Sequence, residues 1–267
     1  MDLKDRSFTR KILRAGRHLE ELSEVLNDYA DRHSYEIVRT ERRGKYVHTF
    51  TVTEAPPGEI PLIVGDVLYN LRSGFDHLIG ALVPRSQRSK VLFPIVHEPV
   101  WSITPRDGEN ADRTRNRERW DSLTAKISNP AAVPVLQTLQ PIPSNLPPPP
   151  GMHVLDILNK LSNKDRHSEL SVIVTGMHDP KFKLIMRGGQ PRDADDGQMF
   201  GPNKGMKDQA ELPAGDDVAY VKVRGRVITA VRIPSHQTQL LLPDSLASML
   251  QWVTSQAILP LAPYVID

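Results

Sequence analysis

The stretch from residue 64 to residue 83 constrains this chain most, because it has the period of a helix and two chemically different faces. A helix advances about 100° per residue. On a helical wheel drawn with this angle, one side carries apolar residues and a glycine, at Val67, Leu71, Gly74, Phe75, Leu78, Ile79, Ala81 and Leu82. The other side carries polar groups, at Asp66, Tyr69, Asn70, Arg72, Ser73, Asp76 and His77. This amphipathic pattern predicts a helix that packs one face on a core.

The polar face of this stretch differs from an ordinary solvated face. It lacks Lys, Glu and Gln and instead has short carboxylates, an amide, an arginine and a histidine. Arginine offers a fixed fork of donors that matches phosphate oxygens, and imidazole titrates near neutral pH. These side chains therefore form a candidate site. The alternative is that they are the wet face of a surface helix.

Helical and strand patterns follow one another along the chain, so we expect an α+β fold in a single domain. Apolar spacings of three and four predict a bundle of helices near residues 8–31, 64–83, 118–139, 152–167 and 244–258. β-branched and aromatic residues predict an inserted β-hairpin at 35–53 and a C-terminal antiparallel sheet at 170–234. In this arrangement a helical core, residues 1–168, carries the hairpin, and a β-rich part, residues 169–267, packs on it.

Four segments refine this outline. A heptad-like seam runs along the first helix, and it predicts lengthwise packing, most simply in a hairpin with the helix at 64–83. The polar segment 102–119 is expected to form a loop leading into a helix, and 188–215 a second long loop. Arg224-Gly225-Arg226 predicts a tight turn between two strands.

Composition narrows the class of protein. The chain has no cysteine, which excludes disulfides and thiol catalysis and favours a cytoplasmic protein over a secreted one. Lys and Arg number 34 against 32 for Asp and Glu, so the net charge alone does not indicate nucleic acid. No apolar run approaches the ~20 residues of a membrane span, so we expect no membrane insertion. No residue pattern indicates a cofactor.

A second polar block lies between residues 152 and 170. If this segment is one helix, Asp165 follows Leu158 and Leu161 onto the apolar stripe. A carboxylate there needs a partner, and Arg72 and His77 are the partners that the first block offers. The alternative is that the helix ends near residues 162–163, which leaves Asp165 in a solvated turn. Asn163 and His167 complete this block.

The spacing of Arg72 and His77 resembles the motif of the HEPN superfamily, helical-bundle proteins whose ribonuclease members carry an Arg and a His several residues apart. The resemblance implies a metal-independent endoribonuclease that acts on RNA, usually as a homodimer. Arg72 would hold the scissile phosphate, and His77 would act as general acid or base in attack by the ribose 2′-hydroxyl. The supporting residues would be Asp66, Asn70, Ser73, Asp76, Asn163, Asp165 and His167.

The chain also resembles a bacterial protein type common in actinobacteria, through four blocks: residues 65–77, 93–95, 139–141 and 161–167. This resemblance implies no activity, but it implies that the two polar blocks share one site.

Two other interpretations stay open. Asp76, His77, Asp165 and His167 could ligate a metal in a metal-dependent hydrolase. Alternatively, Arg72, Asp76, His77 and Asp165 could form a network that pins two helices together in a non-catalytic binding protein. A cluster that opens into a cleft would favour chemistry, and a sealed cluster would favour the structural role. No antitoxin or other protein partner is indicated by the sequence.

Overall fold

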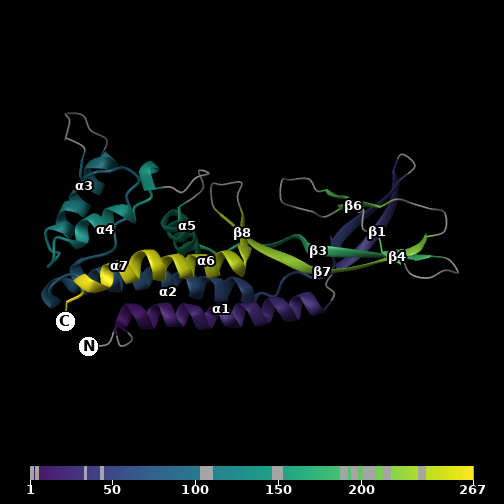
Figure 1. Cartoon of the computed structure of the whole chain (residues 1–267), viewed down its shortest axis with the longest axis horizontal. Helices are drawn as coiled ribbons and strands as arrows, with labels where there is room; N and C mark the ends of the chain where they lie inside the picture. The colour runs from purple at the N-terminus through teal and green to yellow at the C-terminus, as the bar shows by residue number, and fades with distance from the viewer. Residues whose placement is uncertain are drawn as a thin grey trace.

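The computed structural model describes residues 3, 6–32, 35–42, 45–102, 111–145, 153–186, 192–193, 198–200, 209–212, 218–233 and 239–266. Figure 1 shows an elongated molecule, with the helices gathered into a body at one end and most of the strands extending away as an arm. The fold is therefore α+β, as predicted. None of the described helices is long and apolar enough to cross a membrane.

The body is built around α2 (Glu59–Ala81), which packs side by side with α1 (Ser7–Asp31) as the predicted helical hairpin. The seam of α1 is buried at Phe8, Ile12, Ala15, Leu22, Leu26 and Tyr29. Gly74 permits the close approach of the two helices, because a Cβ at this position would lie 2.9 Å from the Ile12 Cδ1 atom. The helix begins five residues earlier than predicted, since Pro61 is tolerated in a first helical turn.

Five more α-helices complete the body among the described residues. α5 (Val154–His167) crosses α2, and α6 (Asp244–Trp252) contacts α1 and continues through a wider helical turn, η4 (Val253–Ile258), into α7 (Leu259–Leu261). The predicted helical region 118–139 is divided into α3 (Ala111–Thr124) and α4 (Ala132–Thr138), with Pro130 in the break. Short 3-10 turns occur at η2 (Arg85–Lys90), η3 (Pro143–Asn145) and η5 (Ala262–Tyr264).

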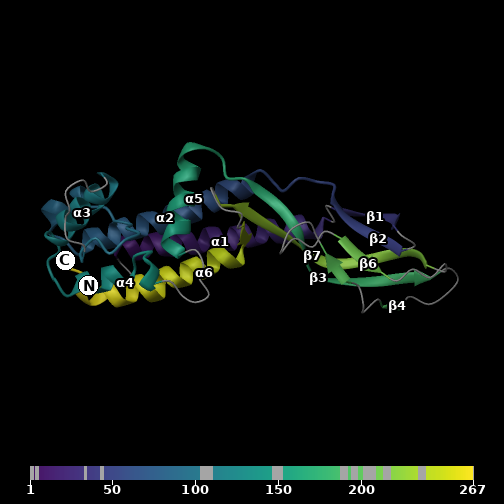
Figure 2. The ribbon, with the colours of Figure 1, turned by 90° about the horizontal axis from the view of Figure 1, so that it is seen from above.

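The strands in the described part of the chain form two antiparallel four-stranded sheets. One has the order β1 (Tyr35–Arg42), β2 (Lys45–Val52), β6 (Gln209–Leu212), β5 (Gln198–Phe200). The other has the order β4 (Arg192–Asp193), β3 (Val172–Met186), β7 (Val218–Arg232), β8 (Gln239–Leu242). Figure 2 shows β3 and β7 running from the body out into the arm. The C-terminal helices α6 and α7 lie with the helical body rather than with the arm.

Three details of the prediction were wrong. The polar segment 102–119 was expected to be a loop, but α3 already begins at Ala111, where Arg115 pairs with Asp112 one turn earlier at 3.2 Å. The expected loop 188–215 contains β4, β5 and β6. Residues 224–226 form no turn, because β7 runs straight through them as one strand and pairs with β3 at both Arg224 and Arg226. The hairpin itself is confirmed, although β6 also pairs with β2.

Candidate functional site

Arg72 and Asp76 hold the main chain of Phe93 against α2. The Arg72 Nη2 atom donates a hydrogen bond of 2.9 Å to the Phe93 carbonyl oxygen. The Phe93 N–H donates to the Asp76 Oδ1 atom at 2.9 Å, and the same oxygen lies 3.5 Å from Arg72 Nη2. Because residues four apart share a helix face, both side chains reach the same peptide segment. This Arg72–Asp76 clamp fixes segment 91–96, which is neither helix nor strand.

The clamp is shielded from solvent. The side chains of Arg72 and Asp76 are 13% and 24% exposed. Burial lowers the pKa of Arg72, the Asp76 carboxylate opposes this change, and Arg166 on α5 lowers the pKa further. The Nη1 atom of Arg72 is buried with no hydrogen-bond partner among the described residues. Arg72 therefore supplies positive charge to its surroundings while its guanidinium is held in place by the fold.

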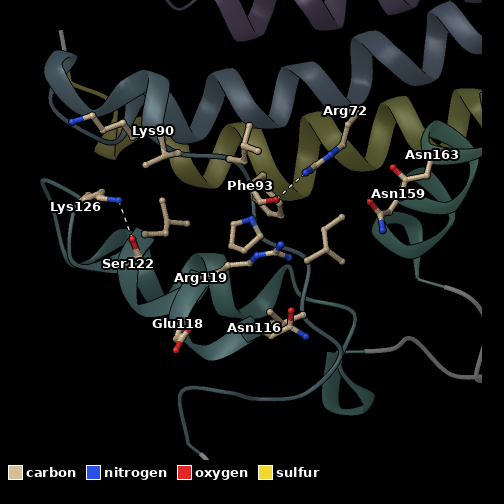
Figure 3. Close-up of a pocket in the computed structure, with 16 residues that line it drawn as sticks. Arg72, Lys90, Phe93, Asn116, Glu118, Arg119, Ser122, Lys126, Asn159 and Asn163 are labelled. Carbon is tan, nitrogen blue, oxygen red and sulfur yellow. Dashed lines mark hydrogen bonds between the residues drawn. The ribbon is translucent and has the colours of Figure 1, made fainter. Parts of the chain in front are cut away.

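A cleft of about 630 Å³ lies beside the clamp. Figure 3 shows it between α2, segment 91–96, α3 and α5. Its lining includes cations, amides and apolar side chains: Arg72, Lys90, Val91, Leu92, Phe93, Pro94, Ile95, Val96, Asn116, Glu118, Arg119, Ser122, Leu123, Lys126, Asn159 and Asn163. The volume is within the range of small-molecule sites. The segment that the clamp fixes is therefore one wall of a cleft.

The cations of the cleft other than Arg72 come from α3, from the turn that follows α3 and from η2. Arg119 extends from α3 toward segment 91–96, opposite Arg72, and its guanidinium has no hydrogen-bond partner among the described residues. Lys126, just after α3, donates to the Ser122 hydroxyl at 2.9 Å. Lys90, at the end of η2, has its ammonium directed away from Arg72 and Arg119 in Figure 3. Arg119 and Lys126 are thus the cations best placed to meet a bound anion.

Arg72 and His77 do not converge, contrary to what the nuclease motif requires within one chain. Residues five apart on a helix diverge by about 140°, and α2 continues as one helix through both positions. Gly74, which lies between them, allows the close packing of α1 on α2. His77 is exposed and has no hydrogen-bond partner among the described residues. Only Arg72 of the pair lines the cleft.

Asp165 lies on α5 facing α2, as predicted, but its predicted partners were wrong. It forms no hydrogen bond or ion pair with Arg72 or His77, all three being described residues. The carboxylate instead rests on Gly65, where a Cβ would lie 2.5 Å from the Asp165 Oδ1 atom. Burial raises the pKa of Asp165, and the nearby Asp66 carboxylate raises it further. The alternative that the helix ends near residue 163 was also wrong, because α5 extends to His167.

The remaining predicted residues are separated by the fold. Asn163 lines the cleft. The buried Asn70 donates from its side chain to the Asp66 carbonyl oxygen of its own helix at 2.8 Å. Ser73 is half-buried, and Asp66 and His167 are exposed. No group of three or more His, Asp or Glu side chains in the described part of the chain could hold a metal ion, so the predicted ligand set Asp76, His77, Asp165 and His167 is not gathered.

The two polar blocks do meet, through Arg72 and Asn163 of the predicted site residues rather than through the predicted contact of Asp165 with Arg72 or His77. Arg72 of the first block and Asn163 of the second line the same cleft. Sequence reasoning missed Arg119, Lys126 and Asn159. Asn159 carried a signal, because it lies four residues before Asn163 on the polar side of a recognisable helix. Arg119 carried none, since it is one of many arginines in a segment without apolar periodicity.

The contact between Gly65 and Asp165 gives a prediction about the crossing of α2 and α5. We expect Gly65→Ala to destabilise the wild-type protein, because the new methyl group displaces the Asp165 carboxylate. In an Asp165→Ala background the same change should stabilise the protein by about 0.5–1 kcal/mol, the usual gain of Ala over Gly inside a helix. Urea denaturation of the four proteins measures both effects. Equal effects of Gly65→Ala in the two backgrounds would contradict the contact.

His153 and Asp156 join α5 to the elements around the cleft. His153 is the N-cap of α5, and its Nδ1 atom accepts the Leu155 N–H at 3.2 Å. Its ring meets Trp252 edge-on at 5.2 Å. Asp156 lies 3.1 Å from the Nε2 atom of His97, which follows the cleft wall directly. Burial lowers the pKa of His153, the nearby Asp156 raises it, and His97 lowers it.

The lowered pKa of His153 predicts that stability falls as the pH drops. Protonation would both charge a side chain that is 6% exposed and remove the acceptor of the helix cap. The unfolded chain takes up the proton near pH 6.5, before the folded protein does, so the contribution is complete above that pH and lost below it. The contribution of His153 to the change in the free energy of unfolding should reach at most about 1.4 kcal/mol per pH unit. Urea denaturation between about pH 7.5 and 5.5 should show that the free energy of unfolding depends less on pH in His153→Asn than in the wild-type protein. Asparagine keeps a capping group. The same pH dependence in both proteins would refute the prediction.

Comparison of the chain with models of protein families, with curated proteins and with solved structures finds no match.

Proposed function

We propose that the protein binds a phosphate-bearing ligand in the cleft between α2, α3, α5 and segment 91–96. The observation that carries this proposal is Arg119, an unpaired guanidinium that faces the cleft opposite the buried charge of Arg72. Lys126 adds a third cation, and Glu118 is the one carboxylate of the described lining. In Figure 3 the Glu118 carboxylate points away from Arg72. The cleft therefore has a surplus of positive charge directed inward.

The physical basis of the proposal is the match between these donors and phosphate oxygens. Guanidinium and ammonium groups form short charge-assisted hydrogen bonds to phosphate. Arg72 is already held by Phe93 and Asp76, so it adds positive charge without binding the ligand directly. Arg119 can contact the ligand with its whole guanidinium, and Lys126 can use the N–H donors that it does not give to Ser122. The proposal is a form of the non-catalytic binding interpretation, with Arg72 and Asp76 in the structural role.

Isothermal titration of the full chain with inorganic pyrophosphate tests the proposal. We expect saturable binding that weakens as salt is added, and at least a tenfold loss of affinity in Arg119→Met, since one charge-assisted contact contributes about 1.5–3 kcal/mol. Arg17→Met is the matched control, because it removes the same charge from exposed α1, of which no residue lines the cleft. Absence of binding, or equal losses in the two variants, would overturn the proposal.

A second candidate is the metal-independent ribonuclease implied by the Arg72–His77 spacing. The observation in its favour is that His77 is exposed and free of hydrogen bonds to the described residues, and so is accessible to a substrate. Since the two residues diverge on α2, an active site would have to combine Arg72 of one protomer with His77 of another in a homodimer.

An RNA-cleavage assay in EDTA tests the ribonuclease. Wild-type protein should cut RNA and His77→Ala should not, because His77 would supply the proton transfer. Size measurement on the same sample should find a dimer. If wild-type protein leaves RNA intact, or if His77→Ala cuts as fast as wild type, the ribonuclease is excluded. Phosphate binding in the cleft is tested separately, by the titration with pyrophosphate.

A further inference from the structure

Two unpaired carboxamides mark one end of the cleft. Asn159 and Asn163 lie one turn apart on α5, and both line the cleft on the side where Arg72 enters it. Neither side chain forms a hydrogen bond with any of the described residues. Each amide presents two N–H donors and one carbonyl acceptor. This end of the cleft therefore offers hydrogen-bond acceptors as well as donors.

Phosphate alone would leave these acceptors unsatisfied. A phosphodianion has only acceptor oxygens, so it can meet the amide N–H groups but not the amide carbonyl oxygens. A hydroxyl group donates and accepts at once, and two vicinal hydroxyls can meet both amides. A site built to bond hydroxyl groups rejects an analogue that lacks them, because its polar groups are then left unpaired in the complex.

The apolar wall does not supply an aromatic platform. Leu92 is 69% exposed, whereas Phe93, the one aromatic residue in the described lining, is 2% exposed and turned into the core. The part of the ligand beyond the phosphate is thus met mainly through hydrogen bonds at Asn159 and Asn163.

We propose that the ligand is a phosphate ester of a polyol, with its phosphate at Arg119 and Lys126 and its hydroxyl groups at Asn159 and Asn163. This inference rests on the proposed function. It adds the hydroxyl-bearing part of the ligand to the phosphate group already proposed. The same chemistry is present in a free sugar phosphate and in the ribose phosphate of a nucleotide, and the experiment separates these two sources.

Titration of the full chain with ethyl phosphate, ribose 5-phosphate and uridine 5′-monophosphate tests the inference. Ethyl phosphate carries the charge without hydroxyl groups. We expect wild-type protein to bind ribose 5-phosphate at least tenfold more tightly than ethyl phosphate. The Asn159→Leu/Asn163→Leu double variant should bind ribose 5-phosphate and ethyl phosphate with equal affinity. Arg119→Met should weaken the binding of both by a similar factor.

The outcomes distinguish this inference from the proposed function. Equal affinity of wild-type protein for ethyl phosphate and ribose 5-phosphate overturns the polyol ester and leaves anion binding standing. Binding of neither overturns both. Among supporting results, tighter binding of uridine 5′-monophosphate than of ribose 5-phosphate identifies a nucleotide as the source, and equal or weaker binding identifies a free sugar phosphate. A circular-dichroism spectrum unchanged in the double variant confirms that it is folded.

Discussion

Replacing Asp76 with alanine is expected to lower the free energy of unfolding by about 3 kcal/mol, as removal of one partner from a buried ion pair does. The carboxylate accepts the Phe93 N–H at 2.9 Å and faces Arg72 at 3.5 Å. Its loss leaves both the amide and a guanidinium that is 13% exposed without this partner. The affinity of the cleft for pyrophosphate should fall as well, because segment 91–96 is one of its walls.

Two further variants isolate the cause of this effect. Arg72→Met combined with Asp76→Leu removes both charges, so it should cost less than Asp76→Ala alone, since no buried charge is left unpaired. Ser73→Ala, on the same helix and half-buried, should change the free energy of unfolding by no more than about 0.5 kcal/mol. Urea denaturation gives all three values. A loss below about 1 kcal/mol in Asp76→Ala would contradict the clamp.

Phe75→Ala is expected to have the larger effect on stability, about 4 kcal/mol. The Phe75 side chain is 1% exposed, and its ring lies 4.7 Å from Phe93 and 6.5 Å from Trp252. It therefore joins α2, segment 91–96 and α6, and truncation opens a cavity among all three. The aromatic contact with Phe93 adds about 0.5–1.5 kcal/mol beyond the buried area.

The comparison with Phe75→Leu shows whether packing explains this loss. Leucine keeps most of the apolar volume, so its cost should be about half that of alanine or less. Thermal and urea denaturation measure both variants. If Phe75→Ala cost less than about 2 kcal/mol, then the Phe93 ring would not be held by Phe75, and the cleft wall would depend on the clamp alone.

The helices could be predicted from the sequence because their signals are local. The seam of α1 and the apolar face of α2 repeat every three or four residues, and both lie where the period placed them. The short strands β5 and β6 could not be predicted, because their polar sequences form strands only through pairing that reaches β2, more than 150 residues earlier in the chain. α3 lacks an apolar stripe, so its polar sequence resembled a loop.

The candidate site was predictable only in part, for a related reason. The sequence identified α2 and α5 as the helices that carry polar groups toward each other, and Arg72 and Asn163 do line one cleft. The partners of the polar side chains on these helices include main-chain atoms and a glycine. Arg72 bonds a carbonyl oxygen, and Asp165 lies on Gly65, and neither contact has a signature in side-chain chemistry. Spacing alone therefore paired Arg72 with His77, although a straight helix separates them.

A crystal structure of the protein soaked with tungstate, a heavy analogue of phosphate, tests the central claim most directly. The account predicts an anomalous peak in the cleft within hydrogen-bonding distance of the Arg119 guanidinium, and its loss in crystals of Arg119→Met. A cleft without tungstate, or a peak that persists unchanged in Arg119→Met, would contradict the account.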